Sequence, residues 1–231
     1  ALIMSGAVLV NGRSITKVGH LVKPDEDIIL KDKGCPYVSR AGLKLEAALR
    51  HFNVCVKNKI CLDVGASTGG FTDCLLRQGA RLVYAVDVGY GQLDWKLRNR
   101  PDVVNLEKTN IKNLSRNVFQ HIPDLATIDT SFISLKKVIP KVIKLLDHRA
   151  DLIALIKPQF EAGRKKVGKG GVIRDTAVHE EVLSDLKDFF TEEAGLLCEG
   201  IIQSPIFGAK GNREFLVHLK KQFPLQDDKE L

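Results

Sequence analysis

The feature that most constrains the fold is a glycine-rich stretch at residues 59–73. An apolar run that contains Asp63 leads into small residues, and a helical pattern resumes at Phe71. This order predicts a strand, a tight turn and the start of a helix. Glycine lets the backbone approach a ligand closely, and the first amides of a helix carry partial positive charge. We therefore expect a small ligand at this turn, with a purely structural turn as the alternative.

The positions of the glycines argue against a nicotinamide dinucleotide, whose fingerprint is G-x-G-x-x-G. The glycines here are Gly65, Gly69 and Gly70, and an acid stands two residues before the first. A second apolar run, residues 82–86, is followed by Asp87. A ribose-binding carboxylate is expected at that point, about 20 residues beyond the turn. Asp87 is thus predicted to bind ribose hydroxyls, and a helix cap is the alternative.

Apolar segments alternate with helical patterns along most of the chain. The segments expected to be strands lie near residues 60–64, 82–86, 102–106, 124–129, 151–157, 197–203 and 214–219. Helical patterns start near Ser39, Ser134 and Asp175. Such alternation predicts an α/β, Rossmann-like fold with a mostly parallel seven-stranded sheet that helices cover on both faces. Ligands bind such sheets at the carboxyl ends of the strands.

The two ends of the chain depart from this pattern. Residues 1–30 hold short apolar runs around Asn11-Gly12, a strong signal for a hairpin turn, but they are too few to bury a core of their own. Residues 31–38 resemble a linker, and residues 225–231 a polar tail. We therefore expect a small N-terminal unit followed by one large domain over residues 39–224.

Charge and cysteine content limit the possible functions. The net charge of +7 favours a polyanionic partner such as nucleic acid but does not require one. The five cysteines lack C-x-x-C spacing, so we expect buried thiols in a reducing compartment. No histidine or cysteine pattern indicates a metal site, and no apolar run reaches the roughly 18 residues of a membrane helix. The sequence predicts a cytoplasmic protein that binds no metal.

Charged side chains occur where three of the expected strands begin or end. Asp129 and Lys157 each follow an apolar run, and Glu214 precedes the last one. A lysine directly after an apolar run is costly unless it has a partner. A salt bridge explains each residue alone, but clustering at strand ends favours a functional site. Lys44 lies at the edge of the apolar stripe of the first helix, where lysine usually snorkels to solvent.

A basic loop follows the strand that ends at Lys157. Its glycine and lysine spacing approaches that of a phosphate-binding P-loop, but Gly170 stands where serine or threonine would bind magnesium. We therefore reject a nucleotide-hydrolysing site and expect the loop to meet a phosphate backbone. The residues assigned to this contact are Arg164, Lys165, Lys166, Lys169 and Arg174. A merely solvated loop is the alternative.

Several motifs together resemble the haemolysin A (TlyA) family. They are SRAGLKL at residues 39–45, LDVGASTGGFT at 62–72, IDTSFISL at 128–135, LIKPQFE at 155–161 and GNRE at 211–214. That family is similar to the FtsJ-type ribose 2′-O-methyltransferases, and the resemblance covers nearly all of residues 1–220. It implies a class I methyltransferase fold, S-adenosylmethionine as cofactor, and ribosomal RNA or a ribosomal subunit as partner. Residues 6–29 resemble the second half of an S4 RNA-binding domain.

The resemblance also implies roles for single residues. A Lys-Asp-Lys-Glu catalytic tetrad falls on Lys44, Asp129, Lys157 and Glu214. The positions implied around the cofactor are Asp63, Gly65, Ser67, Gly69, Gly70, Phe71, Asp87 and Asn110. Ser67 stands where the broader methyltransferase pattern D-x-G-x-G-x-G has its middle glycine.

Such a tetrad suits methyl transfer to a sugar hydroxyl, which requires removal of a poorly acidic proton. Two lysines held close together lower each other's pKa, so one can act as base while the other, still charged, stabilises the developing alkoxide. We assign Lys157 as the base and Asp129 as the residue that orients it. Lys44 is then the charge stabiliser, and Glu214 fixes Lys44 or the ribose. The sequence alone allows the two lysines to exchange roles.

Other functions stay open at this point. The main rival is a non-catalytic RNA-binding or ribosome-assembly factor on a methyltransferase scaffold, although such a factor would not need an intact tetrad. A haemolysin, taken as a pore-forming toxin, would need a spanning segment. A small-molecule methyltransferase would not need the basic loop.

Overall fold

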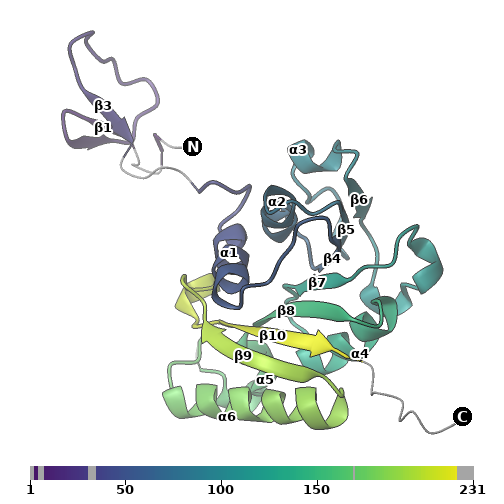
Figure 1. The fold of residues 1–231 in the computed structure, drawn as a ribbon. Coiled ribbons are helices and arrows are strands. Elements are labelled where there is room, and N and C mark those ends of the chain that lie inside the picture. Colours follow the sequence, from purple (N-terminus) through teal and green to yellow (C-terminus); the bar gives the residue numbers. More distant parts are fainter. Residues whose placement is uncertain (1–2, 5–7, 31–34, 169, 223–231) are drawn as a thin grey trace, which may run out of the picture. The chain divides into compact units, whose positions relative to one another are not determined.

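The computed structural model describes residues 3–4, 8–30, 35–168 and 170–222 (Figure 1). The chain forms two compact units, residues 1–36 and residues 37–231. The boundary between them falls inside the linker expected at residues 31–38. The expected polar tail, residues 225–231, lies outside the described residues.

The N-terminal unit contains a three-stranded antiparallel sheet in the order β2-β1-β3. Its strands are β1 (Val8–Val10), β2 (Arg13–Ile15) and β3 (Ile28–Leu30). Val10 pairs with Arg13 across Asn11 and Gly12, which both have positive φ, as a two-residue hairpin turn requires. The predicted hairpin turn is confirmed, whereas the likeness to an S4 domain stays a prediction.

The larger unit is built on a seven-stranded sheet in the order β6-β5-β4-β7-β8-β10-β9 (Figure 1). The strands are β4 (Ile60–Val64), β5 (Leu82–Val86), β6 (Val103–Leu106), β7 (Leu125–Ile128), β8 (Ala150–Ile156), β9 (Leu197–Gln203) and β10 (Phe215–Lys221). Neighbours from β6 to β8 are parallel, and β10 runs antiparallel to β8 and β9. The predicted, mostly parallel sheet is confirmed.

Helices connect the strands and cover both faces of the sheet. They are α1 (Ala41–His51), α2 (Gly70–Arg77), α3 (Trp95–Arg98), α4 (Leu135–Leu145), α5 (Pro158–Glu161) and α6 (Thr176–Asp188). The Ser134 hydroxyl accepts a hydrogen bond from the amide of Lys136, and the Asp175 carboxylate accepts one from Ala177. These caps satisfy amides that a helix start leaves unpaired, so α4 and α6 begin where the sequence predicts.

The short elements are the 3-10 turns η1 (Ile111–Asn113), η2 (Arg116–Val118), η3 (Arg164–Lys166) and η5 (Ala209–Gly211), and the π turn η4 (Phe189–Glu193).

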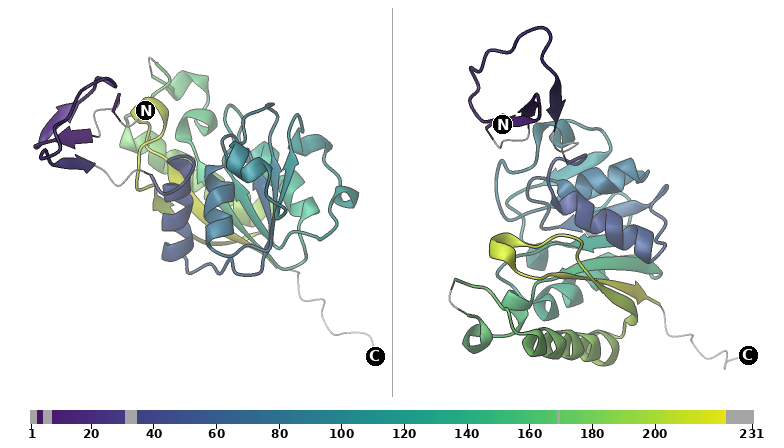
Figure 2. Two further views of the ribbon diagram at one scale, coloured as in Figure 1. Left: turned by 90° about the horizontal axis from the view of Figure 1, so that it is seen from above. Right: turned by 90° about the vertical axis from the view of Figure 1, so that its left-hand side faces the viewer.

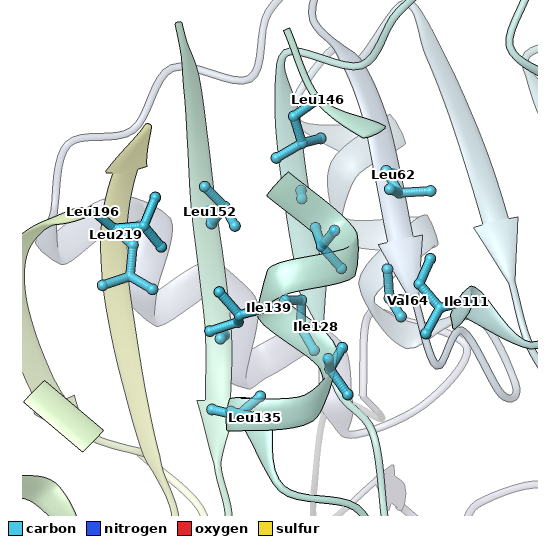
Figure 3. Packing of buried hydrophobic residues seen from close by; sticks show 14 of the residues in the cluster. Leu62, Val64, Ile111, Ile128, Leu135, Ile139, Leu146, Leu152, Leu196 and Leu219 are labelled. Atoms are coloured by element: carbon cyan, nitrogen blue, oxygen red, sulfur yellow. The ribbon is translucent and has the colours of Figure 1, made fainter. Parts of the chain in front are cut away.

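Alternate strand residues face two separate apolar clusters. Leu62 and Ile128 pack with Ile139 of α4 on one face of the sheet (Figure 3), whereas Cys61 and Leu125 pack with residues of α1 and α2 on the other. Figure 2 shows α6, in green, and α1 and α2, in blue, on opposite sides of the sheet. The strands are therefore buried on both faces, which explains their continuous apolar sequences.

The strand order reverses at β4. The chain runs from β4 through β5 to β6 on one side and returns to β7 on the other side of β4. In open parallel sheets this reversal leaves a crevice at the carboxyl ends of the strands, where ligands bind. Gly65 follows β4 and Asp129 follows β7, so both lie at the crevice.

Two expectations about side chains are wrong. Cys35 and Cys55 are exposed, so the cysteines are not all buried thiols. Lys44, expected to snorkel to solvent, is only 9% exposed because it pairs with the buried carboxylate of Glu214. Among the described residues, no helix has the length and apolar character needed to cross a membrane.

Candidate active site

Gly65 lets the ends of β4 and β7 come close together. It has a φ of 84°, in the left-handed region that glycine adopts without steric cost. A Cβ at this position would lie 2.5 Å from the carbonyl oxygen of Asp129. The amides of Gly65 and Ala66 both donate to the carbonyl of Val86, at 2.8 and 3.1 Å. Any side chain at residue 65 would therefore displace the strand ends that form the crevice.

The next two glycines pack against protein. Gly69 has a φ of 95° and precedes α2, and a Cβ there would lie 2.4 Å from Leu97 Cδ1. A Cβ on Gly70 would lie 2.2 Å from Ser39 Oγ. Gly69 lines neither of the two cavities beside the turn. Its predicted contact with a cofactor stays a prediction, and the absence of a side chain lets Leu97 pack on the turn.

Two cavities adjoin the glycine turn at the carboxyl ends of the strands. They share Gly65, Ser67, Asp129 and Ser131. Gly70, Phe71 and Lys157 also line the first cavity. The second has a volume of about 480 Å³ and extends to Asp87 and Asn110. A cavity of that size is typical of a small-molecule site.

Asp87 faces the second cavity and also fixes the glycine turn. Its Oδ2 accepts a hydrogen bond from the amide of Ser67 at 2.8 Å, and its Oδ1 accepts one from Gly89 at 2.7 Å. Ser67 has a left-handed φ of 50°. Asn110 begins η1, where its Oδ1 accepts from the amide of Lys112 at 3.0 Å. Both residues thus lie at the cavity, and each also orders the loop around it.

Asp63 does not reach either cavity. Its carboxylate is fully buried and accepts hydrogen bonds from the hydroxyls of Thr72, at 2.6 Å, and Thr127, at 2.9 Å. Burial raises the pKa of Asp63 to about 6, although these hydrogen bonds oppose the rise. The predicted cofactor contact of Asp63 stays a prediction. It is a positioning residue that ties α2 and β7 to β4.

Lys157 and Asp129 form an ion pair at the first cavity. Lys157 Nζ lies 2.6 Å from Asp129 Oδ1, but the angles of this contact are not those of a hydrogen bond. The same Nζ donates a hydrogen bond to Ser131 Oγ at 2.9 Å. β7 and β8 are parallel neighbours, so their carboxyl ends bring these side chains together. Ser131 was missed from the sequence; its position two residues after Asp129 was the available signal.

Lys44 and Glu214 form a second, buried ion pair. Lys44 Nζ donates to Glu214 Oε2 at 2.6 Å, and Glu214 is 3% exposed. Phe215 pairs with Ile156 in the antiparallel β8–β10 ladder, so Glu214 and Lys157 occupy the next opposed positions. The four residues predicted as a tetrad therefore form two ion pairs, carried by α1 and the ends of three neighbouring strands.

The two ion pairs face different cavities. Asp129 and Lys157 line the first cavity, whereas Glu214 lines a separate small cavity together with Phe207 and Arg213. Lys44 lines none of these three cavities. Direct contact of Lys44 with a substrate hydroxyl stays a prediction.

Phe132 is an exposed aromatic residue at the mouth of the second cavity. It is 90% exposed and has a φ of 62°, a left-handed conformation that is strained for this residue type. Its ring centroid lies 4.9 Å from that of Phe160, in the helix that follows Lys157. An exposed aromatic pair beside the ion pair offers a surface to a planar group. The sequence gives no signal for it, because phenylalanine in an apolar context is usually buried.

The basic loop lies between α5 and α6. Lys165 and Arg174 are exposed, whereas Lys166 forms an ion pair with Glu181 of α6. Lys169 and the side chain of Arg164 lie outside the described residues. Of the five predicted RNA contacts, two are therefore exposed cations and one already has a carboxylate partner.

Comparisons with known proteins agree with this geometry. A model of the FtsJ-like methyltransferase family matches residues 37–221. YqxC of Bacillus subtilis, a candidate rRNA methyltransferase, is 50% identical over 99% of this chain and 82% of its own length. The 16S/23S rRNA (cytidine-2′-O)-methyltransferase TlyA of Mycobacterium tuberculosis is 41% identical over 96% of this chain and 82% of its own. A solved structure from Streptococcus thermophilus, titled a candidate hemolysin, has a TM-score of 0.82 and 44% identity, covering 95% of this chain and 80% of that one.

Proposed function

Because this chain belongs to the FtsJ-like methyltransferase family, we propose that it methylates ribose 2′-hydroxyls of ribosomal RNA, with S-adenosylmethionine as donor. The observation that carries the proposal is the ion pair of Lys157 and Asp129 at a cavity beside the glycine turn. The substrate is supported by a relative that is named an rRNA (cytidine-2′-O)-methyltransferase. A ribosomal substrate implies an enzyme of the cytoplasm.

The walls of the second cavity fit the donor chemically. Asp87 offers a carboxylate to ribose hydroxyls, and Val86 and Ile111 offer apolar surface to a purine ring. The buried hydroxyl of Thr130 also lines this cavity and has no hydrogen-bond partner among the described residues, so a ligand can supply one. When bound, the donor supplies an electrophilic methyl group on a sulfonium.

Lys157 is the general base in this proposal. Asp129 and Ser131 hold its amine at the cavity edge, and a general base must be held within reach of the proton that it removes. In its deprotonated form the Lys157 amine would accept the 2′-hydroxyl proton, and the bound donor would supply the methyl group to the oxygen. The charged ammonium of Lys44, held by Glu214, stabilises the developing negative charge. The assignment of these roles to the two lysines is part of the proposal.

A non-catalytic RNA-binding factor is the second candidate, since the exposed cations Lys165 and Arg174 would serve it equally well. A transfer assay separates the two functions. The protein is incubated with donor carrying a radioactive methyl group and with 16S rRNA, 23S rRNA or intact subunits. We expect label in at least one ribosomal RNA or subunit. RNA binding without transfer to any of them would favour the binding factor.

Asp87→Ala is expected to weaken donor binding by about tenfold or more. The substitution removes a charged acceptor and frees the amide of Ser67 that fixes the turn, and hydrogen bonds to charged groups contribute about 1.5–3 kcal/mol. Isothermal titration calorimetry measures the change. Asp102→Ala is the matched control, because Asp102 immediately precedes β6 and pairs with Arg100 away from the crevice. Equal donor affinity in Asp87→Ala and wild type would remove Asp87 from the donor site.

Replacing Arg164, Lys165 and Lys166 with alanine is expected to weaken RNA binding and flatten its salt dependence. Each phosphate contact adds about 0.7–0.9 to the slope of log K against log salt concentration, so the slope should fall by up to roughly two units. Donor affinity should not change. Fluorescence titrations with a ribosomal RNA fragment at several salt concentrations give the slopes. Equal slopes for wild type and the triple variant would show that this loop does not contact the RNA phosphate backbone.

A further inference from the structure

Asn212 joins two loops that are far apart in the sequence. Its side chain is 3% exposed, and its Nδ2 donates to the carbonyls of Gly171, at 2.9 Å, and Ala209, at 3.2 Å. Its Oδ1 accepts from the amide of Ile173 at 3.1 Å. A buried side chain with three such bonds fixes both backbones. Residues 204–213, here called the second loop, are therefore tied to residues 170–174 at the end of the basic loop.

The second loop adds cations and an aromatic ring to this part of the surface. Lys210 and Arg213 are exposed, and the Lys210 ammonium donates to the carbonyl of Gly170 at 3.1 Å. Phe207 is 57% exposed. Lys210 and Arg213 thus lie on backbone that is joined to the segment carrying Arg174.

The inner side of the second loop rests on the Lys44–Glu214 ion pair. The backbone of Gly208 lies so close to Glu214 that a Cβ there would be 1.9 Å from Oε1. The amide of Ser204 donates to the carbonyl of Glu214 at 2.9 Å. The small cavity lined by Phe207, Arg213 and Glu214 leads from the exposed side of the loop to the buried carboxylate. One short segment therefore contacts solvent on one side and the buried ion pair on the other.

We propose that the second loop and the basic loop form one binding surface for single-stranded RNA next to the active site, with Asn212 as the residue that joins them. Lys210 and Arg213 neutralise phosphates, and Phe207 stacks on a base. A single strand exposes its phosphates and the faces of its bases. Exposed cations bind the phosphates, and an exposed aromatic ring stacks on a base. The neighbouring Glu214 carboxylate pairs with Lys44, so it opposes this charge less than an unpaired carboxylate would. The inference rests on the proposed function and extends its RNA contact to a loop that the sequence did not indicate.

The double variant Lys210→Gln/Arg213→Gln tests the cationic part. Both side chains are exposed, so the fold should be kept. Binding of a fluorescein-labelled single-stranded RNA oligonucleotide is titrated at several salt concentrations. With about 0.7 per phosphate for single strands, we expect the log–log slope to fall by about 1.4, with donor affinity unchanged. Lys57→Gln/Arg81→Gln is the matched control: it makes the same charge change on exposed residues that precede β4 and β5, at the amino ends of these strands and away from the crevice.

Phe207→Ala tests stacking separately from charge. Loss of one base–aromatic stack is expected to weaken binding of the same oligonucleotide roughly 5- to 150-fold. Because the substitution removes no charge, the salt slope should stay that of wild type. Unchanged affinity would overturn the stacking contact, and an unchanged slope in Lys210→Gln/Arg213→Gln would overturn the phosphate contacts.

Asn212→Ala tests the joint between the loops. The substitution removes no charge, but it is expected to lower the salt slope because the two groups of cations are no longer held as one surface. If Asn212 only supports the fold, a variant with the melting temperature of wild type will keep the wild-type slope. If the wild type transfers no methyl group but the variants lower the salt slope as expected, the proposed function fails and the shared RNA surface stands. If it methylates RNA and all the slopes are equal, only this inference fails.

Discussion

Replacing Lys157 with alanine is expected to slow methyl transfer by a factor of roughly 10² to 10⁴, while donor affinity stays within a few-fold of wild type. The amine at this position pairs with Asp129, donates a hydrogen bond to Ser131 and lies at the first cavity. A group that acts in the transition state affects the rate more than ground-state binding. Single-turnover kinetics with ribosomal RNA, together with calorimetry of donor binding, measure the two effects separately.

Three further substitutions sharpen this test of Lys157. Asp129→Ala should also abolish turnover, because the lysine loses the carboxylate that orients it. Ser131→Ala removes one hydrogen bond and should cost much less. Lys141→Ala changes an exposed lysine of α4 and should leave the rate unchanged. Near-normal turnover in Lys157→Ala, with a normal melting temperature, would contradict the assignment of Lys157 as the general base.

Glu214→Ala is expected to destabilise the protein by about 3–5 kcal/mol, because it leaves the Lys44 ammonium buried without its partner. For a domain of this size, each kcal/mol lowers the melting temperature by about 2–4 °C, so a loss of roughly 10 °C is expected. The double variant Lys44→Met/Glu214→Met removes both charges at similar volume. It should recover most of the stability, since buried ion pairs contribute little net stability relative to apolar residues.

The same pair of variants separates folding from catalysis. If Lys44 stabilises the transition state, the double variant will be stable but slow. Wild-type rates in the stable double variant would show that Lys44 and Glu214 serve only the fold. Wild-type stability in Glu214→Ala would show that the Lys44 side chain reaches solvent when its partner is removed. Differential scanning calorimetry and the transfer assay provide the two measurements.

The sheet and the location of the site could be predicted because their signals are local. Apolar runs mark the buried strands, and a polar residue directly after a run marks the strand end, as Asp129 and Lys157 show. The glycine turn could be predicted in the same way, because its glycines directly follow an apolar run. What fills the space beside those glycines could not be predicted, because a sequence does not show whether a ligand or a side chain such as Leu97 lies there.

The remaining features depend on contacts between distant parts of the chain. The burial of Lys44 is decided by Glu214, 170 residues later. The joint at Asn212 depends on carbonyl and amide groups of a loop about 40 residues earlier, which no local pattern reveals. The exposure of Phe132 follows from a left-handed backbone that places its ring outside the core. Pairings of this kind follow from the register of the strands, which apolar periodicity fixes only within each strand.

Nucleoside mass spectrometry of modified RNA tests the proposed reaction most directly. Ribosomal RNA or subunits from cells that lack this activity are treated with wild-type protein or Lys157→Ala and with donor carrying a ¹³C methyl group, and the RNA is digested to nucleosides. We predict a labelled nucleoside whose fragmentation leaves the methyl group on the ribose, formed by the wild type and absent with Lys157→Ala. A labelled methyl group on the base, or equal labelling by both proteins, would contradict 2′-hydroxyl methylation with Lys157 as the base.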